Sequence, residues 1–241
     1  MRAILCGANG AMGRLIDAAL PGEVVGRVSI DGENNVPKTF EEMGDIAADV
    51  LIDFSHHTAA QAVCAYAVAN RCCLVVGTTG HTPEEKAVIA QAAESIPVFF
   101  SGNMSMGIAI LCKLAKQTAA AFPGADIEIL EIHHNRKADA PSGTAKMLFK
   151  AMREARPELT MNCGRAGGGK RTPDEVGISS VRMGNIVGIH EVHISTGNQT
   201  LTLRHEAHDR GMFAEGAVEA AGFLMGKKPG LYNMNHLLEA K

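Results

Sequence analysis

The chain has 241 residues, 46% of them hydrophobic and 20% charged, which is enough for one large domain or two modest ones. Its 23 basic and 26 acidic side chains give a net charge of −3, and aromatic residues make up only 4%. This composition argues against nucleic acid or an anionic membrane surface as the partner. No apolar run approaches about 18 residues, and the run after Met1 is too short for a signal peptide, so we expect a cytoplasmic globular protein.

The first hundred residues alternate short apolar runs with segments of helical periodicity, the pattern of βαβ units around a parallel sheet. Helices are expected at 12–20, at 59–70 and from Pro83 onward, where Thr82 provides the N-cap and Glu85 follows at the capping-box position. The expected strands cover residues 3–6, 24–30, 50–54, 72–76 and 97–100.

The pattern changes after Gly102. The later strands cluster with little helix between them, which is typical of an open α+β arrangement in a second domain. The expected elements are a helix at 107–121, a strand at 127–134, a helix at 143–155, strands at 178–183, 191–195 and 200–204, and a final helix at 213–224.

The six cysteines form no C-x-x-C pair and no zinc-ribbon spacing. Free cysteine is among the most buried residue types. We therefore expect all six to be reduced, buried and structural: Cys6, Cys64, Cys72, Cys73, Cys112 and Cys163.

A glycine-rich loop lies between the first expected strand and the first expected helix. Its spacing, Gly7, Gly10 and Gly13, is G-x-x-G-x-x-G instead of the common dinucleotide fingerprint. Asp31, at the end of the second expected strand, is placed to accept both ribose hydroxyls of an adenosine. The pattern predicts a dinucleotide site, and the alternative is a tight strand-to-helix turn without a ligand.

The residue after Asp31 is Gly32, not a basic residue that would compensate the 2′-phosphate of NADPH. This favours NADH as a cofactor at least as good as NADPH. Arg27 and Lys38 are near enough in the sequence to weaken that inference.

The segment 131–145 carries the densest chemistry in the chain. His133 is a candidate general acid, and Lys137 can pair with an anion or deliver a proton. The helix that begins near Gly143 presents amides that can hold a carboxylate. The alternative is a solvated polar loop with an ordinary serine cap.

The same segment closely resembles the E-x-H-H-x-x-K-x-D-x-P-S-G-T-A signature of the 4-hydroxy-tetrahydrodipicolinate reductase (dihydrodipicolinate reductase) family of diaminopimelate and lysine biosynthesis. The resemblance spans essentially the whole chain. Further blocks match in order at 7–13, 53–55, 77–80, 101–107 and 210–214.

This resemblance implies an α/β protein with a Rossmann dinucleotide-binding domain at 1–104 with 211–241. An open mixed α/β domain at 105–210 would bind substrate and build a homotetramer. It also implies roles for five residues: His133 as proton donor and acceptor, Lys137 as second proton donor, and His134 with the Gly143 and Thr144 backbone as holders of the carboxylates of a small dicarboxylate substrate.

The cofactor contacts implied by the resemblance divide into two sets. The adenosine diphosphate half would lie against Gly7, Ala8, Asn9, Gly10, Ala11, Met12 and Asp31. The nicotinamide would be flanked by Gly77, Thr78, Thr79, Ser101, Gly102, Asn103 and Met104. The family commonly has arginine where this chain has alanine at position 11, and the change strengthens the expectation that NADH serves at least as well as NADPH.

The implied reaction is NAD(P)H-dependent reduction of 4-hydroxy-tetrahydrodipicolinate, in its dehydrated dihydrodipicolinate form, to tetrahydrodipicolinate. Two alternatives are another imino- or amino-acid dehydrogenase on the same scaffold and a non-catalytic nucleotide sensor. The combination of His133, His134, Lys137, Gly143 and Thr144 argues against the first alternative, and the presence of both His133 and Lys137 argues against the second.

Other histidines and glycines leave weaker signals. No metal site is expected from His190-x-x-His193 or His205-x-x-His208, because this spacing sends side chains to opposite faces of a strand. His56 and His57 lie either in a surface loop or against the cofactor. The run 167–171 is expected to be a surface loop and not a phosphate loop.

Overall fold

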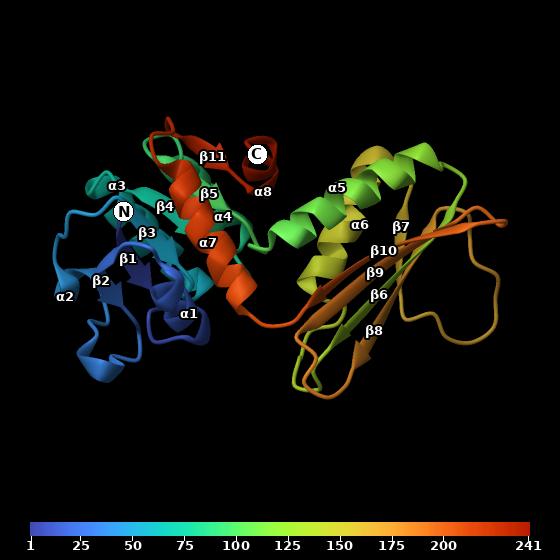
Figure 1. The fold of residues 1–241 in the computed structure, drawn as a ribbon, viewed down its shortest axis with the longest axis horizontal. Helices are drawn as coiled ribbons and strands as arrows, with labels where there is room; N and C mark the ends of the chain where they lie inside the picture. Colours follow the sequence, from blue (N-terminus) through green and yellow to red (C-terminus); the bar gives the residue numbers. More distant parts are fainter. The chain divides into compact units, whose positions relative to one another are not determined.

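The computed structural model describes all residues from 1 to 241 and divides into two compact units (Figure 1). Unit 1 contains Met1–Ser105 and Arg210–Lys241, and unit 2 contains Met106–Asp209. Unit 2 is therefore an insertion into the chain of unit 1. None of the helices is both long and apolar enough to cross a membrane.

Unit 1 is built on a six-stranded parallel sheet in the order β11-β5-β4-β3-β1-β2. The central strands are apolar on both faces, with Leu51 and Ile52 both buried, because helices cover both sides. The strands are β1 (Arg2–Cys6), β2 (Glu23–Val28), β3 (Val50–Asp53), β4 (Cys73–Val76), β5 (Pro97–Phe100) and β11 (Gly230–Tyr232).

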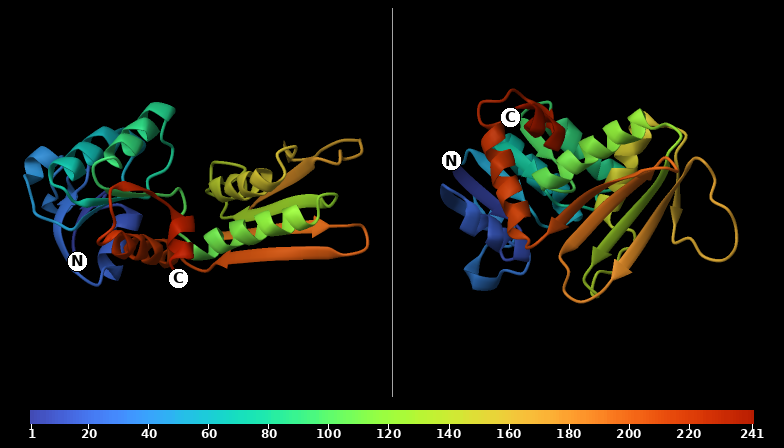
Figure 2. Two further views of the ribbon diagram at one scale, coloured as in Figure 1. Left: turned by 90° about the horizontal axis from the view of Figure 1, so that it is seen from above. Right: turned by 45° about the vertical axis from the view of Figure 1, so that its right-hand side comes forward.

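Two helix pairs sandwich this sheet (Figures 1 and 2). α1 (Ala11–Ala19) packs with α7 (Gly211–Leu224), and α3 (Ala60–Ala69) packs with α4 (Pro83–Ala92) on the other face. Shorter helices are α2 (Phe40–Met43), α8 (Met234–Glu239) and 3₁₀ turns at Glu33–Asn35 and His57–Ala59. The strand order reverses between β1 and β3, the point at which ligands bind at the carboxyl ends of such sheets.

Unit 2 has a mixed five-stranded sheet in the order β10-β9-β6-β8-β7. Its helices α5 (Met106–Ala121) and α6 (Gly143–Ala155) pack together and share one apolar core with one face of the sheet (Figure 2). The strands are β6 (Asp126–His133), β7 (Thr160–Cys163), β8 (Glu175–Arg182), β9 (Gly188–Ser195) and β10 (Thr200–Ala207).

Strand β6 is the element that positions the chemistry of unit 2. It runs parallel to β8 and antiparallel to β9, and its buried side chains alternate with less buried ones. Ile127 and Ile129 begin the buried series, and Glu131 and His133 continue it on the same face. A carboxylate and an imidazole thereby occupy positions that usually hold aliphatic side chains.

The expected α/β class and most expected elements are present. α6 has the predicted bounds, and α4 begins with the predicted capping box of Thr82 and Glu85. The expectation of a final helix ending at 224 is wrong, because β11 and α8 follow it. β11 has only three residues and pairs only with β5, so the sequence shows no alternating pattern that would predict it.

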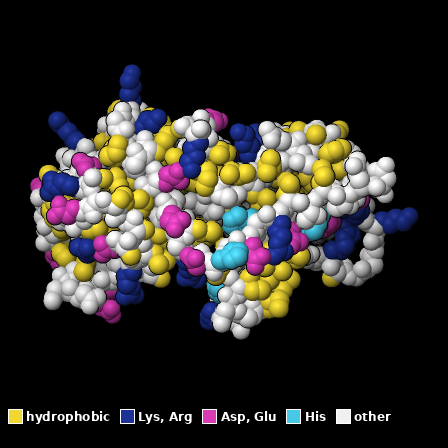
Figure 3. Space-filling model, viewed as in Figure 1, with side chains coloured by type: hydrophobic (Ala, Val, Ile, Leu, Met, Phe, Trp, Pro, Cys, Tyr) yellow, Lys and Arg dark blue, Asp and Glu magenta, His cyan; other side chains and the backbone are white.

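Two further expectations need correction. β2 ends at Val28, not at residue 30, because the chain turns away there and Ile30 is exposed. All six cysteines are free, but only Cys6, Cys64 and Cys72 are buried. Cys73 and Cys112 are half-buried, and Cys163 is exposed at the end of the outermost strand β7, so the expectation that all six are buried is wrong. On the face shown in Figure 3, basic and acidic side chains are interspersed, in keeping with their near balance in the composition.

Candidate functional site

The glycine loop of unit 1 is shaped by close backbone approaches. Gly7 has φ +81° and donates its amide to the Val28 carbonyl at 2.8 Å. A Cβ on Gly7 would lie 2.3 Å from the Phe54 carbonyl oxygen, and one on Gly13 would lie 2.3 Å from that of Gly7. No larger residue fits at either position without moving the backbone.

The loop leads directly into the start of α1. Gly10 is the N-cap in an extended conformation, with no side chain capping the helix and no acidic residue in its first turn. The first amides of α1 are therefore available to a pyrophosphate, which a helix N-terminus favours through its partial positive charge. Gly10 and Ala11 are exposed, whereas Ala8 is buried and donates its amide to Val28.

Asp31 lies in the turn after β2 and is fully exposed. Its Oδ1 accepts hydrogen bonds from Asn9 Nδ2 at 2.6 Å and from the Glu33 amide at 3.0 Å. These bonds lower the pKa of Asp31, with the Asn9 bond the larger cause. The structure thus joins two predicted residues, the loop asparagine and the acid, beside the glycine loop.

The loops after β3, β4 and β5 meet at the same edge of the sheet. The Ser55 amide donates to Thr78 Oγ1 at 2.9 Å, and the Ser55 hydroxyl donates to buried Asp53 at 2.5 Å. Burial raises the pKa of Asp53. The Ser101 amide donates to the Val76 carbonyl at 3.2 Å, which joins the segment after β5 to β4.

The predicted nicotinamide-flanking residues differ in exposure. Thr79 and Gly102 are exposed and lie close together, since a Cβ on Gly102 would be 3.8 Å from Thr79 Cγ2. Met104 has its side chain buried, and its carbonyl oxygen would lie 1.8 Å from a Cβ on Gly216 of α7. The Met104 side chain is therefore buried, and its backbone lies close to α7.

The two histidines after β3 differ in their surroundings. His57 Nδ1 lies 2.9 Å from the Glu85 carboxylate of α4, and its ring faces that of His81 edge-on. His56 is exposed and caps the 3₁₀ turn by accepting the Thr58 amide. His57 thus fastens the loop after β3 to α4.

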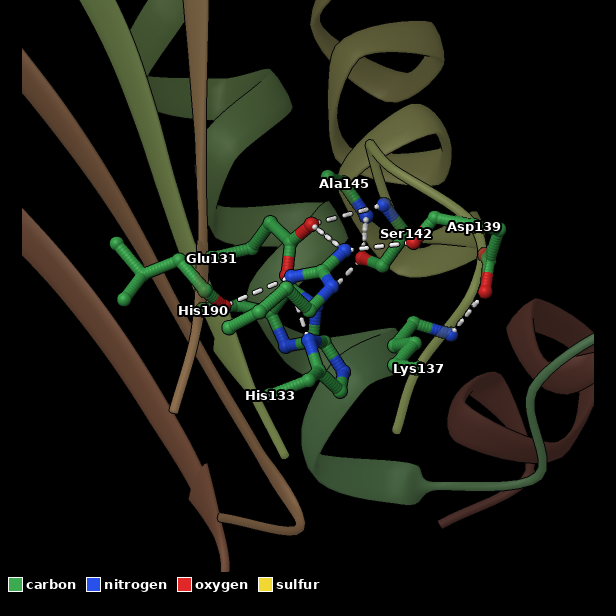
Figure 4. A network of polar contacts seen from close by, with 9 residues as sticks. Glu131, His133, Lys137, Asp139, Ser142, Ala145 and His190 are labelled. Atoms are coloured by element: carbon green, nitrogen blue, oxygen red, sulfur yellow. Dashed lines mark hydrogen bonds and ion pairs between the residues drawn. The ribbon is translucent and has the colours of Figure 1, made fainter. Parts of the chain in front are cut away.

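In unit 2, the buried pair on β6 has a short contact (Figure 4). His133 Nδ1 lies 2.5 Å from Glu131 Oε2. Arg182 of β8 grips the same carboxylate with both terminal nitrogens, at 2.8 and 2.7 Å. Burial alone would raise the pKa of Glu131, but the hydrogen bonds from His133 and Arg182 outweigh it and bring the pKa well below its usual range.

The turn between β6 and α6 carries the other predicted proton donor (Figure 4). Lys137 Nζ forms an ion pair with Asp139 Oδ1 at 2.7 Å. The Lys137 amide donates to the His134 carbonyl, and the His134 amide donates to the Ile186 carbonyl at 2.7 Å. His133 is the last residue of β6, and His134 and Lys137 lie at the start of the loop that follows it.

Helix α6 begins beside the same carboxylate. The Ser142 amide donates to Glu131 Oε1 at 3.1 Å, and its hydroxyl accepts the Ala145 amide at 3.1 Å. That hydroxyl is also 2.9 Å from Nε2 of buried His190, whose pKa burial lowers to about 3. Gly143, the first helical residue, is exposed and followed by no acidic side chain in the first turn.

Three members of this network were missing from the sequence analysis as functional residues: Glu131, Arg182 and His190. The alternation of β6 could have placed Glu131 beside His133, since residues two apart share a face. Arg182 and His190 reach the site through the register of β8 and β9, which the sequence does not reveal.

The other histidines and the glycine run singled out in the sequence lie as follows. His190 is buried and His193 half-buried on opposite faces of β9, as the strand spacing predicts. Residues 167–170 are exposed and belong to neither a helix nor a strand, and Arg171 pairs with Glu128 at 2.9 Å.

A doubly wound parallel sheet with a glycine-rich loop before its first helix, together with a second unit that holds a histidine paired with a buried carboxylate and a nearby lysine, is the arrangement of a dinucleotide-dependent oxidoreductase. A family model described as "Dihydrodipicolinate reductase, N-terminus" matches residues 1–104, and one described as "Dihydrodipicolinate reductase, C-terminus" matches residues 107–238. The chain therefore belongs to the dihydrodipicolinate reductase family.

Individual relatives agree. The 4-hydroxy-tetrahydrodipicolinate reductase of Caldanaerobacter subterraneus subsp. tengcongensis is 40% identical over 250 residues, with 99% of this chain and 98% of the relative covered. That of Caulobacter vibrioides is 42% identical over 248 residues, with 98% and 96% covered. A dipicolinate-bound dihydrodipicolinate reductase from Paenisporosarcina sp. TG-14 has a similar structure, with a TM-score of 0.78, 25% identity and 98% of each chain covered.

Proposed function

We propose that this chain reduces 4-hydroxy-tetrahydrodipicolinate, through its dehydrated dihydrodipicolinate form, to tetrahydrodipicolinate, with NADH or NADPH as the reductant. The observation that carries the proposal is the buried Glu131–His133 pair on β6, together with Lys137 in the loop after β6 and the start of α6 at the end of that loop. The same chain carries a cradle for a dinucleotide in unit 1. The relatives named above support the choice of substrate.

Unit 1 is proposed to bind the dinucleotide and unit 2 the substrate. Dipicolinate, bound in the Paenisporosarcina relative, is a flat ring with two carboxylates and so belongs to the same ligand class. In this chain, His134 and the amides of Gly143 and Thr144 are proposed to hold the carboxylates. A helix start without acidic side chains suits that role.

The cofactor, when bound, supplies the hydride that the conjugated imine accepts. The chain supplies the proton and the charge that balance this step. His133 uses Nδ1 for Glu131, so Nε2 is the atom left to exchange a proton with the substrate. Lys137 presents an ammonium group that can deliver a second proton or stabilise developing negative charge. Fixing both carboxylates of the ring removes much of the entropic part of the barrier.

The preference for NADH over NADPH, or equal use of the two, is also part of the proposal. Arg27 is bound to Asp17 at 2.9 Å and so is engaged away from the ribose site. Lys38 lies against Gly32, where a Cβ would be 2.5 Å from Lys38 Cε. Lys38 is therefore one basic side chain near Asp31 that could make NADPH usable, and Arg14 is another, since its charge acts on the Asp31 carboxylate. Asp31 itself favours the free ribose of NADH.

A homotetramer formed through unit 2 completes the proposal. Its sheet is covered by α5 and α6 on one face. On the opposite face, Leu130, Ile132 and Val181 are half-buried apolar side chains with no helix of the unit against them. Light scattering on the eluting protein should give a mass of about four chains.

One assay tests the activity and the cofactor preference together. Freshly made product of dihydrodipicolinate synthase is mixed with the purified chain, and oxidation of NADH or NADPH is followed by absorbance. We expect turnover with both cofactors, with kcat/KM for NADH equal to or above that for NADPH. A preference for NADPH beyond about tenfold, ~1.4 kcal/mol, would contradict the cofactor argument only. No oxidation with either cofactor would contradict the activity.

A further inference from the structure

We propose that Glu131 and Arg182 act as one positioning unit for both proton donors, fixing the tautomer of His133 and the place of the Lys137 turn. This inference rests on the proposed function, because it assigns residues that support His133 and Lys137 in the reaction. Glu131 is fully buried, and Arg182 is bound to Glu131 and to the Asp139 carbonyl, so we assign both a role through the groups they hold.

The carboxylate of Glu131 is surrounded by donors. Oε2 faces His133 Nδ1 at 2.5 Å and Arg182 Nη1 at 2.8 Å, and Oε1 faces the Ser142 amide at 3.1 Å and Arg182 Nη2 at 2.7 Å. An ionised carboxylate can only accept hydrogen bonds. The His133 contact therefore requires the hydrogen on Nδ1 and leaves Nε2 as the exchanging nitrogen.

Space at Nε2 is preserved by a glycine on the neighbouring strand. A Cβ on Gly188 of β9 would lie 3.1 Å from His133 Nε2, closer than most Cβ contacts. The ring of His190 meets that of His133 edge-on, with 5.1 Å between centroids, and so limits its rotation. The outward nitrogen of His133 is thus fixed in direction as well as in protonation.

Arg182 connects this carboxylate to the second donor. Its Nη2 also donates to the Asp139 carbonyl at 2.6 Å. Asp139 in turn holds Lys137 Nζ at 2.7 Å through its side chain. One guanidinium group therefore supports both the acceptor of His133 and the turn that carries Lys137. Its planar fork suits this double task, which a lysine ammonium would not reproduce.

The start of α6 is connected through Ser142 to the Glu131 carboxylate, which Arg182 also binds. Its amide donates to Glu131, and its hydroxyl caps the helix and contacts His190 (Figure 4). The amides proposed to hold a substrate carboxylate follow directly in the chain. The buried Glu131 carboxylate thereby fixes the proposed proton donors and the proposed carboxylate site relative to one another.

The same sheet offers a matched control. Glu191 on β9 also contacts a histidine, His193 at 3.1 Å, and an arginine, Arg204. These groups are more exposed than Glu131 and bind neither His133 nor the Lys137 turn. Glu191→Gln therefore removes a comparable charge without touching the positioning unit.

The test combines nitrogen-15 spectra of the histidine rings with steady-state kinetics on the full chain. The His133 signals are identified by their loss in His133→Gln, and spectra are taken at a pH where the ring is neutral. Wild type should show the Nδ1–H form. In Glu131→Gln we expect a mixture of tautomers, with kcat reduced by about 10- to 100-fold and KM changed by less than about threefold. Glu191→Gln should stay within about twofold in both constants.

Arg182→Lys gives a second measurement in case Glu131→Gln does not fold. It keeps the charge but loses the fork, so kcat should fall and KM should rise as the Lys137 turn loosens. A wild-type spectrum of the Nε2–H form, or kinetics of both variants within about threefold of wild type, would overturn the inference. The spectrum decides the tautomer even if wild type shows no reductase activity, so failure of the proposed function remains distinguishable.

Discussion

At the scale of single residues, the two proposed proton donors lie in different surroundings. His133 is buried and paired with Glu131, whereas Lys137 is half-buried and paired with an exposed aspartate. A lysine in such a pair can release Asp139 and bind a substrate carboxylate instead, since the exchange conserves charge. The two donors should therefore respond differently to removal.

His133→Gln should lower kcat by ~10²-fold or more with little change in KM, because it removes a proton donor and no charge that binds substrate. Lys137→Ala should lower kcat and raise KM together, since Lys137 has both tasks. Steady-state kinetics of the two variants check this. Turnover of His133→Gln within about threefold of wild type would mean that the histidine lies on an ordinary polar loop.

At the scale of the elements, β9 inserts a titratable residue into the core of unit 2. Burial lowers the pKa of His190 to about 3, and the nearby His133 adds to that effect. In the unfolded chain the pKa is about 6.5. The unfolded state therefore binds the proton first as pH falls. Above pH ~6.5, His190 is neutral in both states and does not change the free energy of unfolding with pH. Between pH ~6.5 and ~3, the free energy of unfolding falls as the pH falls, by at most ~1.4 kcal/mol per pH unit.

His190→Gln keeps a hydrogen-bonding side chain beside Ser142 but cannot gain a proton. We expect its free energy of unfolding to depend less steeply on pH than that of wild type between about pH 6.5 and the onset of acid unfolding. Urea titrations at several pH values measure this slope. His193→Gln, on the other face of the same strand, is the control for removing a histidine from β9. Equal slopes for wild type and His190→Gln would show that another group causes the loss of stability at low pH.

The elements also show what could be predicted from the sequence. α6 and the capping box of α4 follow from local chemistry, because their signals lie within a few residues. The position of His133 beside Arg182 depends on the register of β6 against β8, which involves residues far apart in the chain. β11 completes the sheet of unit 1 with three residues that carry no periodic signal. Local patterns therefore singled out His133 and Lys137, whereas the residues that contact them required the structure.

At the scale of the whole molecule, the two units carry the two proposed binding tasks on separate cores. Residues of the glycine loop and Asp31 belong to unit 1, and His133 and Lys137 belong to unit 2. A ligand that binds only the folded state stabilises it by an amount set by its concentration relative to Kd, ~2.7 kcal/mol at 100 times Kd. Stabilisation by each ligand should therefore depend on residues of one unit only.

Thermal unfolding with NADH alone and with dipicolinate alone tests this separation. Asp31→Ala removes the proposed ribose acceptor from an exposed turn, so the fold should survive while NADH-linked stabilisation falls by about 1.4 kcal/mol, a tenfold loss of affinity. Stabilisation by dipicolinate should stay at the wild-type value in that variant. Lys137→Ala should give the opposite result, with the dipicolinate effect reduced and the NADH effect retained. If either substitution weakened both ligands equally in the absence of the other, the assignment of one binding task to each unit would be wrong.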